Sequence, residues 1–176
     1  NDQFFSRDPA RKAPHNAYWN ANDALVMIPK IAVERHFLFD KNTFIGTKPI
    51  TTLKLRYASI NRVTYTYLPA EHRYARFINE EPMMDAYTNT QVKVTNIIVQ
   101  HAPHHAVEKV SYIIVEFEGS GVAEYFIDGM YLKGTWKKPV EGKPTKFYDD
   151  KGVEIKLLPG NTWIQVVHPN IPISMN

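Results

Sequence analysis

Hydrophobic and polar residues follow two different periods along this chain, and the change comes near Pro49. Before it, Leu25 and Ile28 lie at the spacing of an amphipathic helix. Asn20 is a suitable N-cap, because its side-chain oxygen can accept hydrogen bonds from the free backbone N–H groups of a first helical turn. The pattern therefore predicts one helical segment that begins after Asn20 and ends near His36.

After Pro49 apolar and polar residues alternate with a period of two, which is typical of β-strands with one buried face. Leu53 and Leu55, for example, alternate with Lys54 and Arg56. The predicted strands cover residues 53–57, 63–67, 74–78, 91–100, 109–117, 122–127, 130–137, 147–148, 153–157 and 163–167. We therefore predict an α+β fold with about ten strands in antiparallel sheets and one N-terminal helical segment.

Turn residues indicate how some of these strands are joined. Asp128–Gly129 is the strongest hairpin signal, because both residues tolerate the positive φ angles of a type I′ turn. It predicts a hairpin between residues 122–127 and 130–137. The two β-branched stretches 91–100 and 109–117 are expected to pair with each other around a histidine-rich loop.

Length and composition narrow the classes of protein. With 176 residues the chain can bury a sizeable core, and the absence of cysteine excludes disulfides and thiol catalysis. The net charge of +3 comes from scattered cations, so nucleic acid is not an expected partner. No apolar stretch reaches the roughly 18 residues that span a bilayer. Because the chain begins without methionine or a signal peptide, we expect a segment of a longer or processed protein.

The first candidate site lies near the N-terminus, where Arg7 and Arg11 precede His15 and Asn16. Arginine binds anions through two parallel hydrogen bonds, and a histidine can transfer protons near neutral pH. These four residues are therefore candidates for ligand binding, and His15 and Arg11 are the candidate catalytic residues.

A structural role for His15 and Asn16 competes with this hypothesis. Both side chains can satisfy buried polar groups where a linker crosses between domains. We favour this alternative, because no nucleophile or pair of carboxylates is spaced to assist His15. No G-x-S-x-G elbow is present, although a triad assembled from distant positions stays open. The sequence leans away from an enzyme.

Three histidines, His101, His104 and His105, form the densest cluster of metal-ligating side chains. A zinc or copper site needs three or four convergent ligands, and Glu108 could add an oxygen. The alternative, which we favour, is a solvent-exposed hairpin loop without a metal. We expect no cofactor.

Aromatic and basic residues are interleaved between residues 56 and 77. They are Tyr57, Tyr65, Tyr67, Tyr74 and Phe77 with Arg56, Arg62, Arg73 and Arg76. If they share one sheet face, that face can bind single-stranded nucleic acid or a glycan. The alternative is one buried aromatic face and one solvated basic face, which is the commoner arrangement.

Short motifs spread over most of the chain resemble those of a known family. Residues 5–8, F-S-R-D, are followed by R-K-A-P-H-N at 11–16. Later motifs are R-F at 76–77 with Asp85, N-I-I-V-Q at 96–100, G-S-G at 119–121, G-T-W at 134–136 and T-W-I-Q-V-V at 162–167. Their order and spacing resemble the C-terminal domain of the YerB-like lipoproteins of Gram-positive bacteria. One departure is N-E-E at 79–81, where a glycine turn is more usual.

The resemblance implies a division of the chain. The parts are the tail of a preceding, mostly absent domain at 1–19, a helix and connector at 20–48, and a β-rich C-terminal domain at 49–176. The tail is then expected to be irregular and to depend on contacts beyond its own residues. We expect Phe5 and Trp19 to be buried by these contacts and His15 to be hydrogen-bonded.

The resemblance also implies an exported protein, anchored on the extracytoplasmic face of the cell membrane by a lipid outside this chain. Our leading hypothesis is a non-enzymatic binding or scaffolding module of the cell envelope. Its expected partners are its own N-terminal domain and another envelope protein or a glycan. One alternative is an envelope hydrolase or transferase that uses His15 and Arg11 at the junction with the N-terminal domain. The other is nucleic-acid or glycan binding by the aromatic–basic face.

Overall fold

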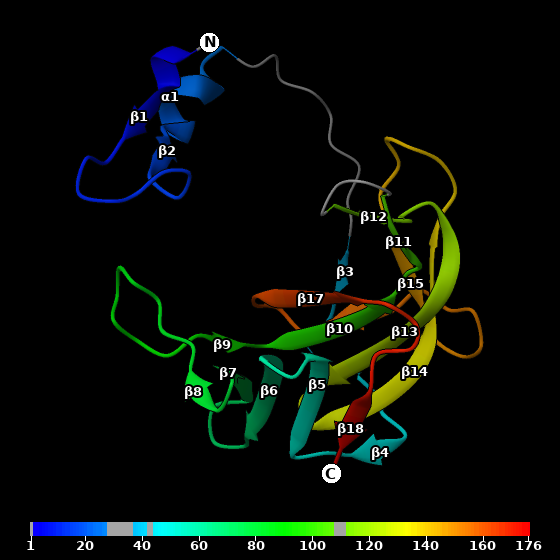
Figure 1. The fold of residues 1–176 in the computed structure, drawn as a ribbon. Coiled ribbons are helices and arrows are strands. Elements are labelled where there is room, and N and C mark those ends of the chain that lie inside the picture. Colours follow the sequence, from blue (N-terminus) through cyan, green and yellow to red (C-terminus); the bar gives the residue numbers. More distant parts are fainter. Residues whose placement is uncertain (1, 28–36, 42–43, 108–111) are drawn as a thin grey trace. The chain divides into compact units, whose positions relative to one another are not determined.

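A computed structural model describes residues 2–27, 37–41, 44–107 and 112–176 of the chain (Figure 1). Packing divides the chain into two compact units, Asn1–Glu34 and Arg35–Asn176. We call them the N-terminal unit and the β-rich unit. The predicted assignment of residues 1–19 to another domain stays a prediction.

The N-terminal unit contains a two-stranded ladder and a short helix. Its elements are the 3-10 helix η1 (Asp2–Phe4), β1 (Phe5–Arg7), β2 (Ala17–Trp19) and α1 (Ala21–Leu25). β1 and β2 pair in antiparallel fashion, so the prediction of an irregular tail is wrong for these strands, although residues 8–16 between them form a loop. Asn20 caps α1, because its Oδ1 accepts a hydrogen bond from the Asp23 N–H at 3.4 Å, which confirms the predicted helix start. The predicted continuation over 28–36 lies outside the described residues.

The β-rich unit contains two larger sheets, which we call sheet 1 and sheet 2. Sheet 1 has the order β15-β14-β13-β10-β17, with β4 paired to β14. Its strands are β4 (Lys48–Pro49), β10 (Asn96–His101), β13 (Gly119–Ile127), β14 (Met130–Lys138), β15 (Lys146–Tyr148) and β17 (Thr162–Val167). Sheet 2 has the order β18-β5-β6-β7-β8, with β9 paired to β7. Its strands are β5 (Thr52–Ala58), β6 (Asn61–Leu68), β7 (Arg73–Ile78), β8 (Glu81–Pro82), β9 (Lys93–Val94) and β18 (Ile173–Met175).

Two further pairs complete the β-rich unit. β11 (His104–Ala106) pairs with β12 (Ile113–Val115), and β3 (Leu38–Phe39) pairs in parallel with β16 (Lys156–Leu157). The predicted strand-dominated α+β class is confirmed. The described residues form 18 strands, more than the ten or so predicted, because many are two or three residues long and too short to show a period.

The predicted pairing of stretches 91–100 and 109–117 is wrong. β10 lies between β13, which is antiparallel to it, and β17, which is parallel. β12 pairs instead with the short β11. The reason is burial: five of the six residues of β10 are buried, so this strand is central and needs a partner at both edges.

The main hydrophobic core lies between the two sheets. Leu53, Leu55 and Tyr65 of sheet 2 pack with Ile97 and Phe126 of sheet 1, and all five are almost fully buried. Burial alternates along β5 and β6, which confirms the period of two there, whereas β10 is buried on both faces. A second core covers the other face of sheet 1 and includes Tyr125, Trp136 and Phe147.

The predicted Asp128–Gly129 turn is confirmed, and it also links the sheets. Both residues have positive φ angles, 51° and 72°, and Ile127 pairs with Met130 across the turn. The Gly129 N–H donates to the hydroxyl of Tyr74 at 2.9 Å. The Tyr67 hydroxyl donates to the Asp128 carboxylate at 2.6 Å. The tip of a sheet 1 hairpin is thus hydrogen-bonded to sheet 2.

We predict that Gly129→Ala destabilises the chain far more than Gly142→Ala. Both glycines have similar positive φ angles, 72° and 77°, so alanine pays about 1–2 kcal/mol of backbone strain at either place. A Cβ at Gly129 would also lie 2.6 Å from the Tyr67 ring, whereas at Gly142 it meets nothing within 4 Å. Displacing that ring adds about 1–3 kcal/mol. Urea unfolding of the two variants tests this, and equal losses would show that the turn is not docked on Tyr67.

Candidate functional sites

The loop between β1 and β2 brings together two of the four predicted binding residues, Arg7 and Asn16. Arg7 Nη1 donates to Asn16 Oδ1 at 2.8 Å, and Asn16 Nδ2 donates to the Asp8 carbonyl at 3.2 Å. The Asp8 N–H in turn donates to the Asn16 carbonyl at 2.9 Å. Asn16 is buried although its neighbours are exposed. These contacts hold the loop, and they fix the Arg7 guanidinium beside the ladder.

The candidate catalytic residues Arg11 and His15 are both exposed. Arg11 pairs with Asp8, with 3.6 Å between Nε and Oδ2. The His15 side chain makes no hydrogen bond within the described residues, so its expected hydrogen bond stays a prediction about contacts beyond them. In the part of the chain that the structure describes, His15 makes no hydrogen bond or ion pair with Arg7, Asn16, Arg11 or Asp8.

Phe5 and Trp19 lie directly opposite each other on one face of the ladder, with Arg7 and Ala17 as the next pair. Within this chain both rings are about half exposed, Phe5 57% and Trp19 51%, so their burial by contacts beyond it stays a prediction. A hollow of about 550 Å³ is lined by Phe5, Ser6, Arg7 and Ala17. We call Phe5, Arg7 and Trp19 the aromatic face. Neither ring is covered, because the contacts that were expected to bury them are not made within the N-terminal unit.

The three histidines of the predicted loop have separate partners. His101 Nε2 lies 2.7 Å from the Glu124 carboxylate, and His105 Nε2 lies 2.7 Å from that of Glu116. His104 Nδ1 contacts the Ala102 carbonyl. Within the described ranges no three metal-ligating side chains converge, and Glu108 lies outside them. The predicted exposure holds for His105 but is wrong for His101, which ends the buried strand β10.

Glu124 is a polar residue of the core that the sequence reasoning missed. The only signal was a carboxylate in the apolar stretch V-A-E-Y-F-I. Burial alone would raise the pKa of Glu124, but hydrogen bonds from His101 and Tyr131 and the nearby charge of Lys133 outweigh it and hold the pKa below its usual value. The carboxylate therefore stays ionised, and it orients the rings of His101 and Tyr131.

We predict that Glu124→Gln lowers stability by about 2 kcal/mol at pH 7, the size of a partly buried hydrogen bond to a charged group. A group with a lowered folded pKa stabilises above its unfolded pKa, near 4.5 for Glu124, and loses this contribution as the pH falls through the folded pKa. The difference between wild type and Glu124→Gln should therefore shrink below about pH 4.5. Urea unfolding at pH 7 and pH 3 measures it.

Glu116→Gln is the matched control. The two histidine–glutamate pairs have the same 2.7 Å separation, but side-chain exposures are 13% and 12% for His101–Glu124 and 58% and 52% for His105–Glu116. Exposed pairs contribute about 0–1 kcal/mol, so Glu116→Gln should change little. A pH-independent loss in Glu124→Gln, or equal losses in both variants, would contradict this account.

Aromatic and basic residues of sheet 2 lie on opposite faces. Tyr65 and Tyr74 are fully buried on the inner face, whereas Arg56 and Arg62 are exposed on the outer one. Arg76 is the exception: it is 6% exposed and pairs across the strands with Tyr65. Its Nε donates to the Tyr65 hydroxyl at 3.1 Å, and its guanidinium carbon lies 4.2 Å from the centre of the Trp163 ring. Arg76 therefore joins the two sheets from inside.

Residues 53–164 match the family described as the C-terminal domain of a protein of unknown function, DUF3048, and the chain belongs to this family. Its structure is similar to the crystal structure of the YerB protein from Bacillus subtilis, with a TM-score of 0.78 and 25% sequence identity. The similarity covers 99% of this chain and 60% of that one, so the chain spans about 60% of the length of YerB. The predicted YerB-like assignment is confirmed. A search of curated proteins found no match.

No helix within the described residues is long and apolar enough to cross a membrane.

Proposed function

We propose that the chain is a non-enzymatic binding and scaffolding module of an exported protein, held on the extracytoplasmic face of the cell membrane by a lipid outside this chain. The proposed location is supported only by the resemblance of the sequence motifs to those of the YerB-like lipoproteins. Protease treatment of intact cells tests it: a protein that stays protected until the membrane is opened contradicts it.

The aromatic face of the N-terminal unit carries the proposed binding role. Phe5 and Trp19 are opposed and both about half exposed to water. Exposing them is unfavourable, because full burial of such a ring contributes about 2 kcal/mol or more of hydrophobic free energy. Trp and Arg are also the residues that most often dominate protein interfaces. Arg7 is already held by Asn16, so little side-chain freedom is lost when a partner binds.

We propose that the partner is the protein's own N-terminal domain. The similarity to YerB covers 99% of this chain but 60% of YerB, so YerB contains further residues beyond the similar part. A covalently joined partner needs no high intrinsic affinity, because its effective concentration is high. A small binding surface built on one cross-strand aromatic pair is therefore sufficient to hold a covalently joined domain.

The alternative of an envelope hydrolase or transferase at this junction would need His15 and Arg11 to converge on a substrate. Arg11 instead pairs with Asp8, and His15 points to no described partner. If the docking role is right, His15→Ala and Arg11→Ala leave docking unchanged, because neither residue belongs to the aromatic face.

We predict that Trp19 is protected when the chain is part of the longer polypeptide and accessible when the chain is alone. Hydroxyl-radical labelling read by mass spectrometry measures this for Trp19 and Phe5. Trp19→Ser in the longer polypeptide should increase labelling of Phe5, whereas Tyr87→Ser should not. Tyr87 is the matched control, because it is an exposed ring in the other unit. Equal labelling of Trp19 in both forms would contradict the proposal.

A further inference from the structure

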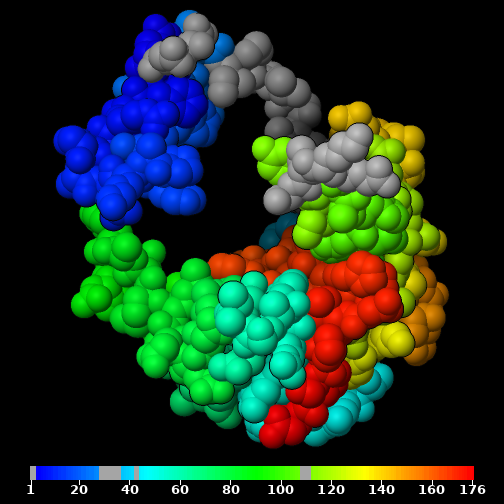
Figure 2. Space-filling view, viewed as in Figure 1, coloured from blue at the N-terminus to red at the C-terminus, as the bar shows by residue number. Residues whose placement is uncertain are grey.

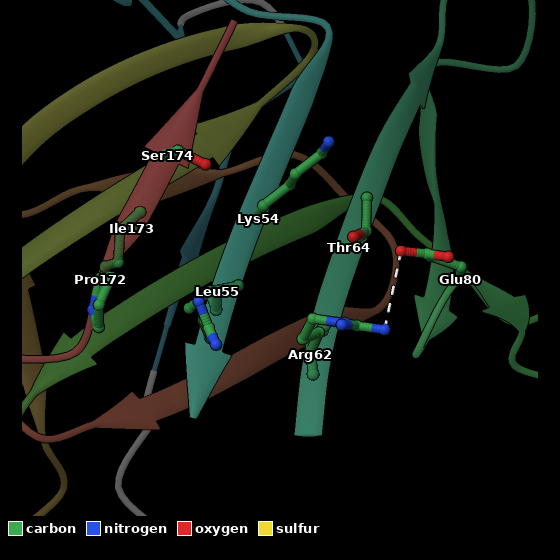
Figure 3. Close-up of a pocket in the computed structure, with 10 residues that line it drawn as sticks. Lys54, Leu55, Arg62, Thr64, Glu80, Pro172, Ile173 and Ser174 are labelled. Atoms are coloured by element: carbon green, nitrogen blue, oxygen red, sulfur yellow. Dashed lines mark ion pairs between the residues drawn. The ribbon is translucent and has the colours of Figure 1, made fainter. Parts of the chain in front are cut away.

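A groove crosses the outer face of sheet 2, the face opposite the core (Figure 3). It has a volume of about 350 Å³ and lies over β18, β5 and β6. In Figure 2, residues of β5 in cyan and of β18 in red adjoin each other on the face turned to the viewer. The polar side chains of the groove are Lys54, Arg56, Arg62, Thr64, Glu80 and Ser174.

The strand register arranges these side chains in two rows. In the first, Lys54 of β5 pairs with Ser174 of β18 on one side and with Thr64 of β6 on the other. Figure 3 shows the Lys54 side chain between these two hydroxyl residues. In the second row, Arg56 of β5 pairs directly with Arg62 of β6. A lysine flanked by two hydroxyls therefore adjoins a pair of arginines.

The cations of the groove are under-neutralised. Directly opposed residues in an antiparallel pair have Cβ atoms about 5 Å apart, and like charges there are destabilising. Lys54 follows on the same face of β5 about 7 Å from Arg56. Among the described residues Lys54 and Arg56 have no carboxylate within 4 Å, and Arg62 has Glu80 at 3.7 Å. Three cations thus share one exposed carboxylate.

The backbone of Glu80 is in a strained conformation. Its φ is +75° and that of Asn79 is +50°, in the turn that joins β7 to β8. Glycine would adopt this conformation without strain. The strained position places a carboxylate at the rim of the groove, where Figure 3 shows its ion pair with Arg62.

We propose that this groove binds a phosphoryl group, either of a soluble phosphate ester or of a lipid headgroup. A terminal phosphate carries up to two negative charges and three acceptor oxygens, which match two guanidinium groups, one ammonium and two hydroxyl donors. A carboxylate offers two oxygens and one charge, and would leave part of this set unused. The proposal goes beyond the docking role of the aromatic face, because it concerns another unit of the chain.

Single-stranded nucleic acid fits the groove less well. Its binding proteins stack successive bases on aromatic rings. In β5, β6 and β7 the rings of Tyr57, Tyr65 and Tyr74 belong to the inner face. Phe77, which pairs with Thr64, lies on the outer face and is half-buried. The groove therefore offers charge and hydroxyl donors without a stacking platform.

Calorimetric titration of the whole chain with sodium phosphate and with glycerol 3-phosphate, at low salt, tests the proposal. Arg56→Gln and Lys54→Gln should each weaken binding by roughly tenfold or more. Arg73→Gln is the matched control: it removes one unpaired cation from the same sheet but lies outside the groove, so binding should stay within about twofold. Equal weakening in all three variants would mean a general effect of net charge and would overturn the site.

Glu80→Gln gives a test in the opposite direction. Removing the one groove carboxylate frees Arg62, so phosphate should bind roughly threefold tighter. A misfolded variant cannot bind more tightly, so this gain separates a ligand role from a structural one. Weaker or unchanged binding in Glu80→Gln would overturn the proposed use of Arg62.

Vesicles distinguish the two sources of the phosphoryl group. A lipid headgroup is supported if the chain cosediments with phosphatidylglycerol vesicles but not with phosphatidylcholine vesicles, and if Arg56→Gln abolishes this cosedimentation. Binding of glycerol 3-phosphate without cosedimentation supports a soluble ester. Binding of oligothymidylate alone, or of none of these probes, overturns the proposal.

Discussion

The β-rich unit depends on the docking of the β13–β14 turn onto two tyrosines of sheet 2. The Tyr67 and Tyr74 rings lie 5.0 Å apart, and each hydroxyl holds one residue of the turn, Asp128 or Gly129. His72 Nδ1 adds a contact of 2.7 Å to the Asp128 carboxylate. Burial and the adjacent carboxylate raise the pKa of Tyr67, so its hydroxyl keeps the proton that it donates. The same bonds hold the pKa of Asp128 below its usual range. The junction is therefore fully formed at neutral pH.

This docking decides what the outer face of sheet 2 can carry. Once Leu53, Leu55 and Val63 are buried against sheet 1, the period of two places Lys54, Arg56 and Arg62 on the other side. A shift of one residue would bury these cations without partners. The cationic rows are thus a consequence of the core, and they are displayed on a rigid surface. Arg76, on the inner face, has no carboxylate within 4 Å among the described residues, and its guanidinium contacts the Tyr65 hydroxyl and the Trp163 ring instead.

Local signals in the sequence were enough for the helix start and for the main hairpin. Asn20 and Asp128–Gly129 act through their own backbone geometry, which neighbouring residues do not override. The partners of β10 could not be predicted, because β17 lies more than sixty residues further along the chain and pairs in parallel. What covers Trp19, which is half exposed in this chain, could not be predicted either, since an apolar pattern shows that a side chain needs cover without showing what supplies it.

The candidate sites were predictable to different degrees. Arg7 and Asn16 are close in sequence and meet in the structure, so grouping them was sound. His101 and Glu124 meet only because β10 and β13 are neighbours, and no local pattern in the sequence indicates that pairing. The basic residues of β5 and β6 were visible as a pattern, but the groove needs Ser174 from β18, and that strand is three residues long.

The most direct test of this account is a map of the amide shifts of the isotope-labelled chain during titration with glycerol 3-phosphate. The account predicts that the largest changes fall on β5, β6 and β18, around Lys54, Thr64 and Ser174, while the inner-face amides of sheet 1 and the whole N-terminal unit stay unchanged. Shifts centred instead on Arg7 and His15, or spread evenly over the exposed lysines and arginines, would contradict it.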